Sequence, residues 1–138
     1  MTPFHLAFPV RDLEATERFY VDVLGCGIGR RAARWIDFDL RGHQISAHLV
    51  DADDAVFDAA NEVDGDAVPA RHFGLVLAWD EWEAMCARLD ALGVRPFIGP
   101  RVRFRGEVGE QGTVFVRDPS GNAIELKAFK DPAMLFAR

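Results

Sequence analysis

The sequence contains little cysteine and no long hydrophobic run. Only two cysteines, Cys26 and Cys86, occur among 138 residues, and they form no CxxC pair. We therefore interpret them as reduced thiols in a cytoplasmic protein. No apolar run is long enough to span a bilayer. The N-terminus, Met1–His5, lacks the basic and apolar segments of a signal peptide, so the sequence predicts no membrane partner.

Positive charge is also scarce, with 16 basic against 22 acidic side chains and a formal net charge of -6. Because a negative surface repels phosphate backbones, nucleic acid is not expected as a partner. No glycine-rich phosphate loop and no serine nucleophile motif appears. Hydrophobic residues make up 49% and charged residues 28%, a balance typical of one compact domain of this length.

The first half of the chain shows one strand, one helix and three more strands. The apolar run Phe4–Val10 predicts the first strand. Asp12 is suited to cap the following helix, whose apolar stripe ends at Gly25. Three strand-like segments follow: Gly27–Ala32, Trp35–Leu40 and Gln44–Val50.

The second half repeats this order. His72–Leu77 predicts a strand, Asp80–Glu83 has the spacing of a helix capping box, and Gly93 ends the helical stripe. Three strand-like segments follow at Arg95–Phe104, Gly112–Arg117 and Ala123–Phe129. The turn Asp118–Asn122 contains the residues that a tight turn prefers.

The repetition predicts the fold class. Asp12 lies as far before Gly25 as Asp80 lies before Gly93, which indicates an internal duplication. We predict an α+β fold of two βαβββ modules with pseudo-twofold symmetry, forming a single domain (1–138) around a metal-binding cavity. The modules cover about 3–50 and 71–129. An acidic, irregular linker (51–70) joins them, and a C-terminal tail (130–138) follows.

Two histidines and one glutamate have positions suited to a metal site. His5 and His72 each begin the first strand of a module; a lone histidine there is more often a core or rim residue, but matched positions would bring two imidazoles face to face. Glu125 alternates with Ile124 and Leu126, so it takes the other face of its strand. Such a carboxylate needs a cation, or a pairing Arg or Lys. We predict that His5, His72 and Glu125 hold one divalent metal as a facial triad, which leaves positions open for substrate.

A third histidine is a candidate for catalysis. The duplication aligns Gly42–His48 with Gly121–Lys127, so Ser46 replaces the partner of Glu125 and His48 shares the inward face with Ser46. We predict that His48 acts as a general acid–base, with a fourth metal ligand or cavity lining as alternatives.

Three arginines alternate along a predicted strand. Arg101, Arg103 and Arg105 would share one face, which could receive a substrate carboxylate. Solvated surface arginines are the default interpretation. Tyr20, the only tyrosine, lies in the first helical stripe and is expected in the core.

Several segments resemble a known superfamily: Phe4–Leu13, Arg18–Tyr20, Val23–Gly25, His72–Gly74 and Asp118–Glu125. Over Pro3–Phe129 the chain is similar to the vicinal oxygen chelate superfamily, which includes glyoxalase I, the bleomycin resistance proteins and the extradiol dioxygenases. It also looks like the small, single-domain proteins described as predicted extradiol-type dioxygenases. It departs from the extradiol enzymes in three ways: Phe115 stands where their signature has a tyrosine, the histidine expected upstream is absent from Arg105–Val108, and the full-size enzymes usually have twice as many βαβββ units. Compared with glyoxalase I, Ser46 stands where that enzyme has its other glutamate ligand.

The resemblance implies a function. The His, His, Glu set resembles that of the extradiol dioxygenases and implies a metal-dependent enzyme that chelates the vicinal oxygens of a small substrate. Fe(II) is the first expectation for the metal, with Mn, Ni or Zn as alternatives. A homodimer is also expected. The alternatives are a glyoxalase-like lyase or isomerase, and a non-catalytic small-molecule binding or resistance protein.

Overall fold

The chain forms two compact units. The computed structural model describes residues 2–51 and 60–137. Unit 1 comprises Met1–Val56 together with Asp118–Asn122, and unit 2 comprises Phe57–Arg117 together with Ala123–Arg138. The chain of unit 2 therefore enters unit 1 for one turn between its last two strands.

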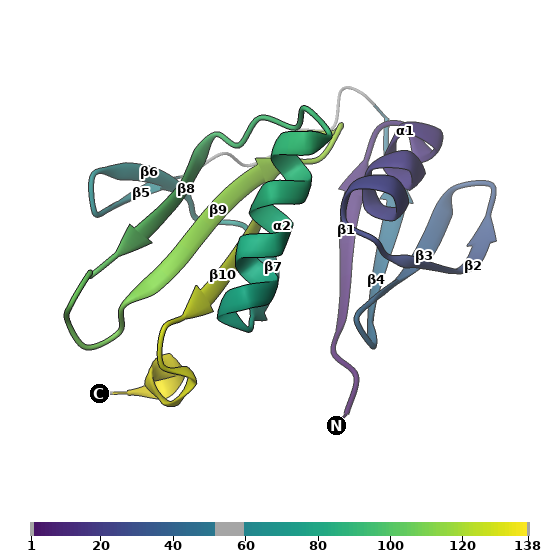
Figure 1. Ribbon diagram of the computed structural model, residues 1–138. Helices are drawn as coiled ribbons and strands as arrows, with labels where there is room; N and C mark the ends of the chain where they lie inside the picture. Colours follow the sequence, from purple (N-terminus) through teal and green to yellow (C-terminus); the bar gives the residue numbers. More distant parts are fainter. Residues whose placement is uncertain (1, 52–59, 138) are drawn as a thin grey trace. The chain divides into compact units, whose positions relative to one another are not determined.

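Unit 1 is a four-stranded sheet with a helical segment on one face (Figure 1). The strand order is β1-β4-β3-β2, with β1 parallel to β4 and the other pairs antiparallel. The elements are β1 (His5–Val10), α1 (Leu13–Arg18), the π-helix η1 (Phe19–Val23), β2 (Gly27–Ala32), β3 (Trp35–Leu40) and β4 (His43–Leu49).

The helical segment begins and packs as the sequence predicts. The Asp12 carboxylate accepts the N–H of Ala15 at 2.9 Å and caps α1. Tyr20 is fully buried, and its ring centroid lies 5.3 Å from that of Phe8 and 5.2 Å from that of Phe38. This aromatic cluster defines the face of the sheet that the helical segment covers.

The turn Asp118–Asn122 is anchored to unit 1 by polar contacts. Asp118, only 4% exposed, accepts the hydroxyl hydrogen of Tyr20 at 3.0 Å. The Asn122 side-chain amide donates to the carbonyl of Pro9 at 2.8 Å, and the Ser120 hydroxyl accepts the N–H of Arg11 at 2.8 Å. The Asp-Pro-Ser-Gly-Asn sequence therefore makes a tight turn and also fixes that turn against β1 and the helical segment.

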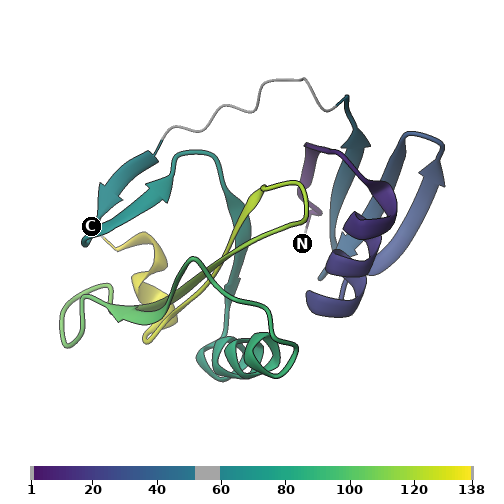
Figure 2. The same ribbon diagram turned by 90° about the horizontal axis from the view of Figure 1, so that it is seen from above.

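Unit 2 has a second four-stranded sheet, of order β7-β10-β9-β8, and a separate two-stranded sheet, β5-β6. Its helix α2 lies across one face of the larger sheet (Figures 1 and 2). The elements are β5 (Ala60–Val63), β6 (Asp66–Pro69), β7 (Phe73–Leu77), α2 (Trp79–Ala91), β8 (Ile98–Arg103), β9 (Gln111–Arg117), β10 (Ala123–Phe129) and the 3-10 helix η2 (Pro132–Phe136).

Close packing holds α2 on its sheet. The indole N–H of Trp82 donates to the carbonyl of Leu126 at 3.0 Å. A Cβ atom at Gly112 would lie 2.7 Å from the Trp82 ring, so a residue without a side chain is needed beneath the indole. Gly112, Val114 and Val116 therefore face the helix, and Thr113 and Phe115 lie on the opposite face of β9.

The predicted fold class is confirmed: each unit contains one βαβββ module, and the fold is α+β. Within the described ranges, no helix is long and apolar enough to cross a membrane. The division into one domain with modules 3–50 and 71–129 and a tail 130–138, and the pseudo-twofold relation of the modules, stay predictions.

The predicted capping box at Asp80–Glu83 is wrong. Helix α2 begins at Trp79, and its N-cap is Ala78 in an extended conformation. The Glu81 carboxylate accepts the N–H of Ala78 at 3.1 Å. Strand β7 ends immediately before, at Leu77, and the helix therefore begins two residues earlier than the capping-box spacing predicts.

Part of the predicted irregular segment 51–70 is regular. Residues 60–69 form the β5-β6 hairpin, whereas 52–59 lie outside the described residues. Val68 packs against Ile98 and Phe115 in one buried cluster. The hairpin thus covers the face of the sheet opposite to α2 (Figure 2). Apolar burial at a single position was too weak a signal to reveal it from the sequence.

The hairpin is also held by an arginine that the sequence analysis placed on the surface. Arg103 is only 4% exposed, so the expectation of a solvated arginine is wrong at this position. Its guanidinium donates to Asp66 at 2.8 Å and to the carbonyl of Val63 at 2.9 Å. Arg101 lies 3.1 Å from the same Asp66 carboxylate. The alternation correctly put both arginines on one face, but their anion is the hairpin's own aspartate.

Replacing Arg103 with Met is expected to destabilise unit 2. Among the described residues, the change leaves Asp66 with Arg101 as its remaining ion-pair partner, and it removes the Arg103 donor from the Val63 carbonyl, at a cost of about 3 kcal/mol. Urea unfolding would measure the loss. Arg105→Met is the matched control, because Arg105 is exposed and should change stability by less than about 0.5 kcal/mol. Equal stability of the two variants would show that the Arg103 contacts do not hold the hairpin.

Candidate functional site

His72 lies directly before β7 and is held in one orientation. Its Nδ1 atom is 2.7 Å from the carbonyl oxygen of Pro69, the last residue of β6. Because a carbonyl oxygen only accepts hydrogen bonds, Nδ1 carries the hydrogen and donates it. The ring of His72 also makes an edge-on contact with Phe115, with centroids 5.2 Å apart. The Nε2 atom is therefore directed away from both supports.

Glu125, on β10, is the group that Nε2 of His72 meets. Its Oε2 atom lies 3.3 Å from that nitrogen. Its Oε1 atom accepts the hydroxyl hydrogen of Thr113 at 2.7 Å, which fixes the carboxylate plane. Lys127 lies on the same face, with Nζ 3.5 Å from Oε2. The structure therefore brings two of the three predicted ligands together.

A glycine allows β7 and β10 to lie close enough for this contact. Gly74 is directly opposite Glu125 in the parallel pairing of the two strands. A Cβ atom at Gly74 would lie 1.6 Å from the backbone oxygen of Glu125. The His72-Phe73-Gly74 sequence thus combines the ligand candidate with the residue that lets its strand approach the glutamate.

The pKa values of this pair shift in opposite directions. The hydrogen bond to Glu125 raises the pKa of His72 above its ordinary value of 6.5; burial opposes this rise, and the Pro69 carbonyl adds a smaller contribution to it. Burial alone would raise the pKa of Glu125, but the hydrogen bonds from His72 and Thr113 outweigh it and hold the pKa below 4.5. The two shifts therefore have one common cause, the contact between Nε2 of His72 and the Glu125 carboxylate.

The pair also gives a stability that depends on pH. The raised pKa of His72 contributes in full below its ordinary value of 6.5 and is lost as the pH rises through the raised value. The lowered pKa of Glu125 contributes in full above its ordinary value of 4.5 and is lost as the pH falls. Between 4.5 and 6.5 both contributions are present.

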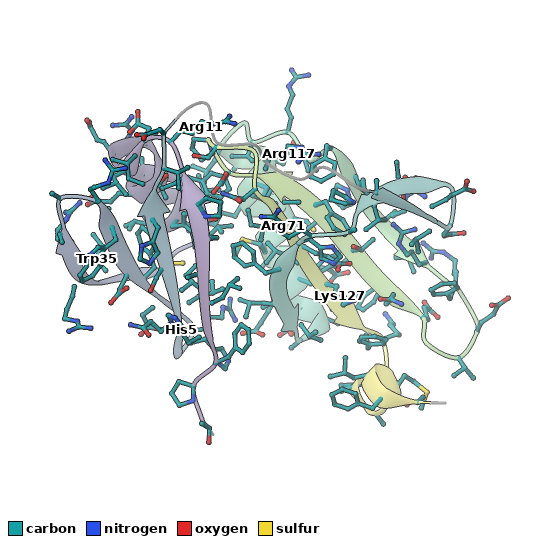
Figure 3. All side chains as sticks on the ribbon, turned by 180° about the vertical axis from the view of Figure 1, so that it is seen from behind. His5, Arg11, Trp35, Arg71, Arg117 and Lys127 are labelled. Atoms are coloured by element: carbon teal, nitrogen blue, oxygen red, sulfur yellow. The ribbon has the colours of Figure 1, made fainter. Side chains whose placement is uncertain are left out.

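In unit 1, His5 and His48 lie on one face of the sheet. His5 is the first residue of β1, opposite Gln44, and His48 lies opposite Pro9 and Trp35 (Figure 3 labels His5 and Trp35). Both histidines are exposed and lie on the face away from the aromatic cluster of the helical segment. The shared face predicted for Ser46 and His48 is confirmed by this register.

The register also relates the two modules. Ala7 lies opposite Ser46 in unit 1, and Gly74 lies opposite Glu125 in unit 2. His5 precedes Ala7 by two residues, as His72 precedes Gly74. Ser46 and Glu125 therefore occupy equivalent positions in their sheets, as the duplication predicts.

Ser46 is engaged by a buried carboxylate. Its hydroxyl donates to Oδ1 of Asp37 at 2.6 Å, and the Gln44 side-chain amide donates to Oδ2 at 3.0 Å. Asp37 is 7% exposed. In unit 2 the carboxylate of Glu125 is on the last strand, β10, and the hydroxyl of Thr113 is on the neighbouring strand, β9. In unit 1 the hydroxyl of Ser46 is on the last strand, β4, and the carboxylate of Asp37 is on the neighbouring strand, β3.

Sequence reasoning missed the groups that support His72 and Glu125. Thr113 and Lys127 could have been found, because strand alternation places Thr113 on the face of Phe115, and Lys127 on that of Glu125. The Pro69 carbonyl carried no signal, since its segment was interpreted as irregular. Among the described residues of either unit, no three His, Cys, Asp or Glu side chains gather into a metal cluster. The complete triad and the role of His48 stay predictions.

A family model matches residues 2–126 of the chain, and it describes the glyoxalase/bleomycin resistance protein/dioxygenase superfamily. The chain belongs to this superfamily. The match covers the first βαβββ module, the second as far as the middle of β10, and every predicted site residue, and it confirms the resemblance found in the sequence. It shows the superfamily without choosing among the chemistries in its name.

Solved structures agree with this assignment. A glyoxalase/bleomycin resistance protein/dioxygenase from Alicyclobacillus acidocaldarius is 32% identical, with 98% of this chain and 96% of that chain covered and a TM-score of 0.82. The fosfomycin resistance protein FosX from Listeria monocytogenes is 19% identical, with 98% of each chain covered and a TM-score of 0.69. A lactoylglutathione lyase from Agrobacterium tumefaciens is 18% identical, with 99% and 97% covered and a TM-score of 0.64. The last two show the shared fold alone. None of the curated proteins matches the chain.

Proposed function

We propose that the chain is a metal-dependent enzyme in which His5, His72 and Glu125 hold one divalent ion that binds vicinal oxygens of a small substrate. The observation that carries this proposal is the orientation of His72. Metal-binding histidines usually donate their other ring N–H to a carbonyl or carboxylate. His72 does so to Pro69, and this directs Nε2 at the Glu125 carboxylate. One imidazole and one oriented carboxylate fit a divalent ion of the first transition series.

The surrounding side chains have distinct tasks in this proposal. Thr113 occupies Oε1 of Glu125 and leaves Oε2 for the ion. Phe115, 1% exposed, packs against the His72 ring and keeps water from that side. When bound, the ion supplies Lewis acidity toward the substrate oxygens and, if it is Fe(II), the capacity to activate dioxygen. His48 accepts a proton from a substrate hydroxyl and later returns it.

Among the reactions of the superfamily, an extradiol-type dioxygenase fits the ligand set best. Ser46 stands at the position equivalent to Glu125 and donates its hydrogen to Asp37, so it supplies no anionic ligand. A triad with open positions suits an ion that binds both substrate and oxygen. Fe(II) is the proposed metal, and Mn, Ni or Zn would serve a glyoxalase-like lyase or isomerase. The remaining alternative, a non-catalytic small-molecule binding or resistance protein that uses the same cavity without an ion, would purify without a stoichiometric metal.

Metal binding as a function of pH tests the proposal. We expect one Co(II) or Fe(II) per chain near pH 8. Because His72 must lose its proton to bind the ion, and its pKa is raised, affinity should fall by at least about tenfold for each pH unit below that pKa. Calorimetric titration at several pH values would measure it. Absence of stoichiometric binding, or an affinity independent of pH between 8 and 5, would contradict a site containing His72.

We also propose that the protein is a homodimer, as the resemblance to the superfamily implies. Sedimentation at micromolar concentration should then show a species of twice the 15.4 kDa chain mass. A single 15.4 kDa species under these conditions would contradict the proposal.

A further inference from the structure

Lys127 lies beside the carboxylate that the proposed metal site uses. It follows Glu125 by two residues on β10, so both side chains are on the same face of the sheet. Its Nζ atom lies 3.5 Å from Oε2 of Glu125, and about a third of its side chain is exposed (32%). Figure 3 labels Lys127 on unit 2.

The two oxygens of Glu125 are used differently. Oε1 accepts the Thr113 hydroxyl hydrogen, whereas Oε2 is shared between Nε2 of His72 and the Lys127 ammonium. A divalent ion held by His72 and Glu125 would therefore compete with Lys127 for the same carboxylate oxygen. Its positive charge and that of the ammonium would then share one carboxylate.

In this arrangement the positive charge of the ion and of Lys127 would exceed the negative charge of the Glu125 carboxylate. Within the described residues, Glu125 is the one carboxylate in ion-pair contact with Lys127. Two neutral imidazoles add no charge, so the ion and the ammonium are opposed by a single carboxylate. Two cations that share one carboxylate repel each other when water is partly excluded. An anionic group that contacts both the ion and the ammonium would be attracted to each of them, and this attraction would offset the repulsion between them.

We propose that Lys127 binds a negatively charged oxygen of the substrate, and that the substrate is an anionic chelator with a carboxylate or similar oxyanion next to a hydroxyl or carbonyl oxygen. This inference rests on the proposed function, because it places the substrate on the ion of His72 and Glu125. It deepens that function by selecting substrates with an oxyanion beside the chelating oxygens, such as 2-hydroxy and 2-oxo acids, over diols, diketones and thioacetals that carry no oxyanion. The lysine makes a charge-assisted hydrogen bond to the oxyanion and thereby orients it on the ion.

Calorimetry on the Co(II)-loaded protein tests this with two probes of nearly the same shape. Oxalate has vicinal oxygens and two negative charges, and oxamide is its neutral isostere. Lys127→Met removes the ammonium and keeps the chain length, whereas Lys127→Arg keeps the charge. Lys130→Met is the matched control, since Lys130 is the sequence's only other lysine and its Nζ lies 4.3 Å from the centroid of the Trp79 ring.

We expect Lys127→Met to weaken oxalate binding by about tenfold or more and to leave oxamide binding nearly unchanged. Lys127→Arg should retain most of the oxalate affinity, and Lys130→Met should match the parent for both probes. Without oxalate, Lys127→Met should bind Co(II) as tightly as the parent or more tightly, because a repelling charge and a competitor for Oε2 are gone.

The outcomes distinguish this inference from the proposed function. Unchanged oxalate affinity in Lys127→Met, or an equal loss for oxamide, would overturn the oxyanion role while the metal site stands. Weaker Co(II) binding in Lys127→Met without oxalate would also overturn it, since the lysine would then serve to hold Glu125. If the parent itself binds no stoichiometric Co(II), the proposed function fails and the inference fails with it.

Discussion

Replacing His72 or Glu125 with Ala is expected to abolish stoichiometric metal binding while the fold is retained. Each residue would supply one ligand, and the remaining groups would leave an ion without its oriented imidazole or its only carboxylate. His72 precedes β7 and Glu125 is half-buried at the centre of β10, so neither change removes a large apolar side chain from the core. Elemental analysis after dialysis against micromolar Co(II) or Fe(II) would measure the metal content.

Two controls separate loss of the ligand from loss of structure. Glu125→Gln keeps an oxygen that can accept the Thr113 hydroxyl hydrogen but removes the charge, so it should lose the metal and still unfold cooperatively, with stability lowered only by the loss of the charged contact with His72. His43→Ala removes a histidine whose Nδ1 accepts the N–H of Phe4 at 3.0 Å, and it should keep the metal. If the His72 and Glu125 variants purify with the parental metal content, the site is elsewhere.

Replacing His48 with Gln is expected to keep the metal and lose turnover by about a hundredfold or more, the usual effect of removing a general acid–base. His48 is exposed and shares a face of the unit 1 sheet with His5. It follows Ser46 by two residues on β4, so the two side chains are on the same face. An imidazole can exchange a proton near neutral pH, and the glutamine amide cannot. The ratio of kcat for variant and parent on an identified substrate measures the effect.

The result of that substitution separates three roles for His48. Loss of the metal together with activity would make it a fourth ligand. Unchanged turnover would make it cavity lining and remove the acid–base proposal. A decrease in kcat with the metal retained, and with the pH dependence of kcat flattened on one limb, is the outcome that the proposed role requires.

Local patterns in the sequence determined most of the secondary structure. Asp12 caps the first helix as predicted, because a cap depends only on the next three residues. The strands at Gly27–Ala32 and Trp35–Leu40 have the predicted bounds. The failure at Asp80–Glu83 shows where local reasoning ends, since the helix begins directly after β7, with Ala78 as its N-cap, although alanine carries no capping side chain.

Contacts between distant segments depended on the tertiary structure. Arg103 and Asp66 are 37 residues apart, and only the folded hairpin makes them a buried pair. The same hairpin supplies the Pro69 carbonyl that orients His72. Residues with strongly polar side chains could be assigned to a face by alternation, but the identity of their partners depends on strand register and docking, which the local sequence does not encode.

The sequence by itself determined the duplicated βαβββ pattern, the superfamily and the pairing of His72 with Glu125 as candidates. It did so because a repeated spacing and a charged residue inside an apolar strand are visible without coordinates. Only the tertiary structure decided that Nε2 of His72 points at Oε2 of Glu125, that Thr113 holds the other oxygen, and that Lys127 stands beside them. These details depend on distances of a few ångströms between side chains on adjacent strands, which are set when the sheet, the hairpin and the helix pack together.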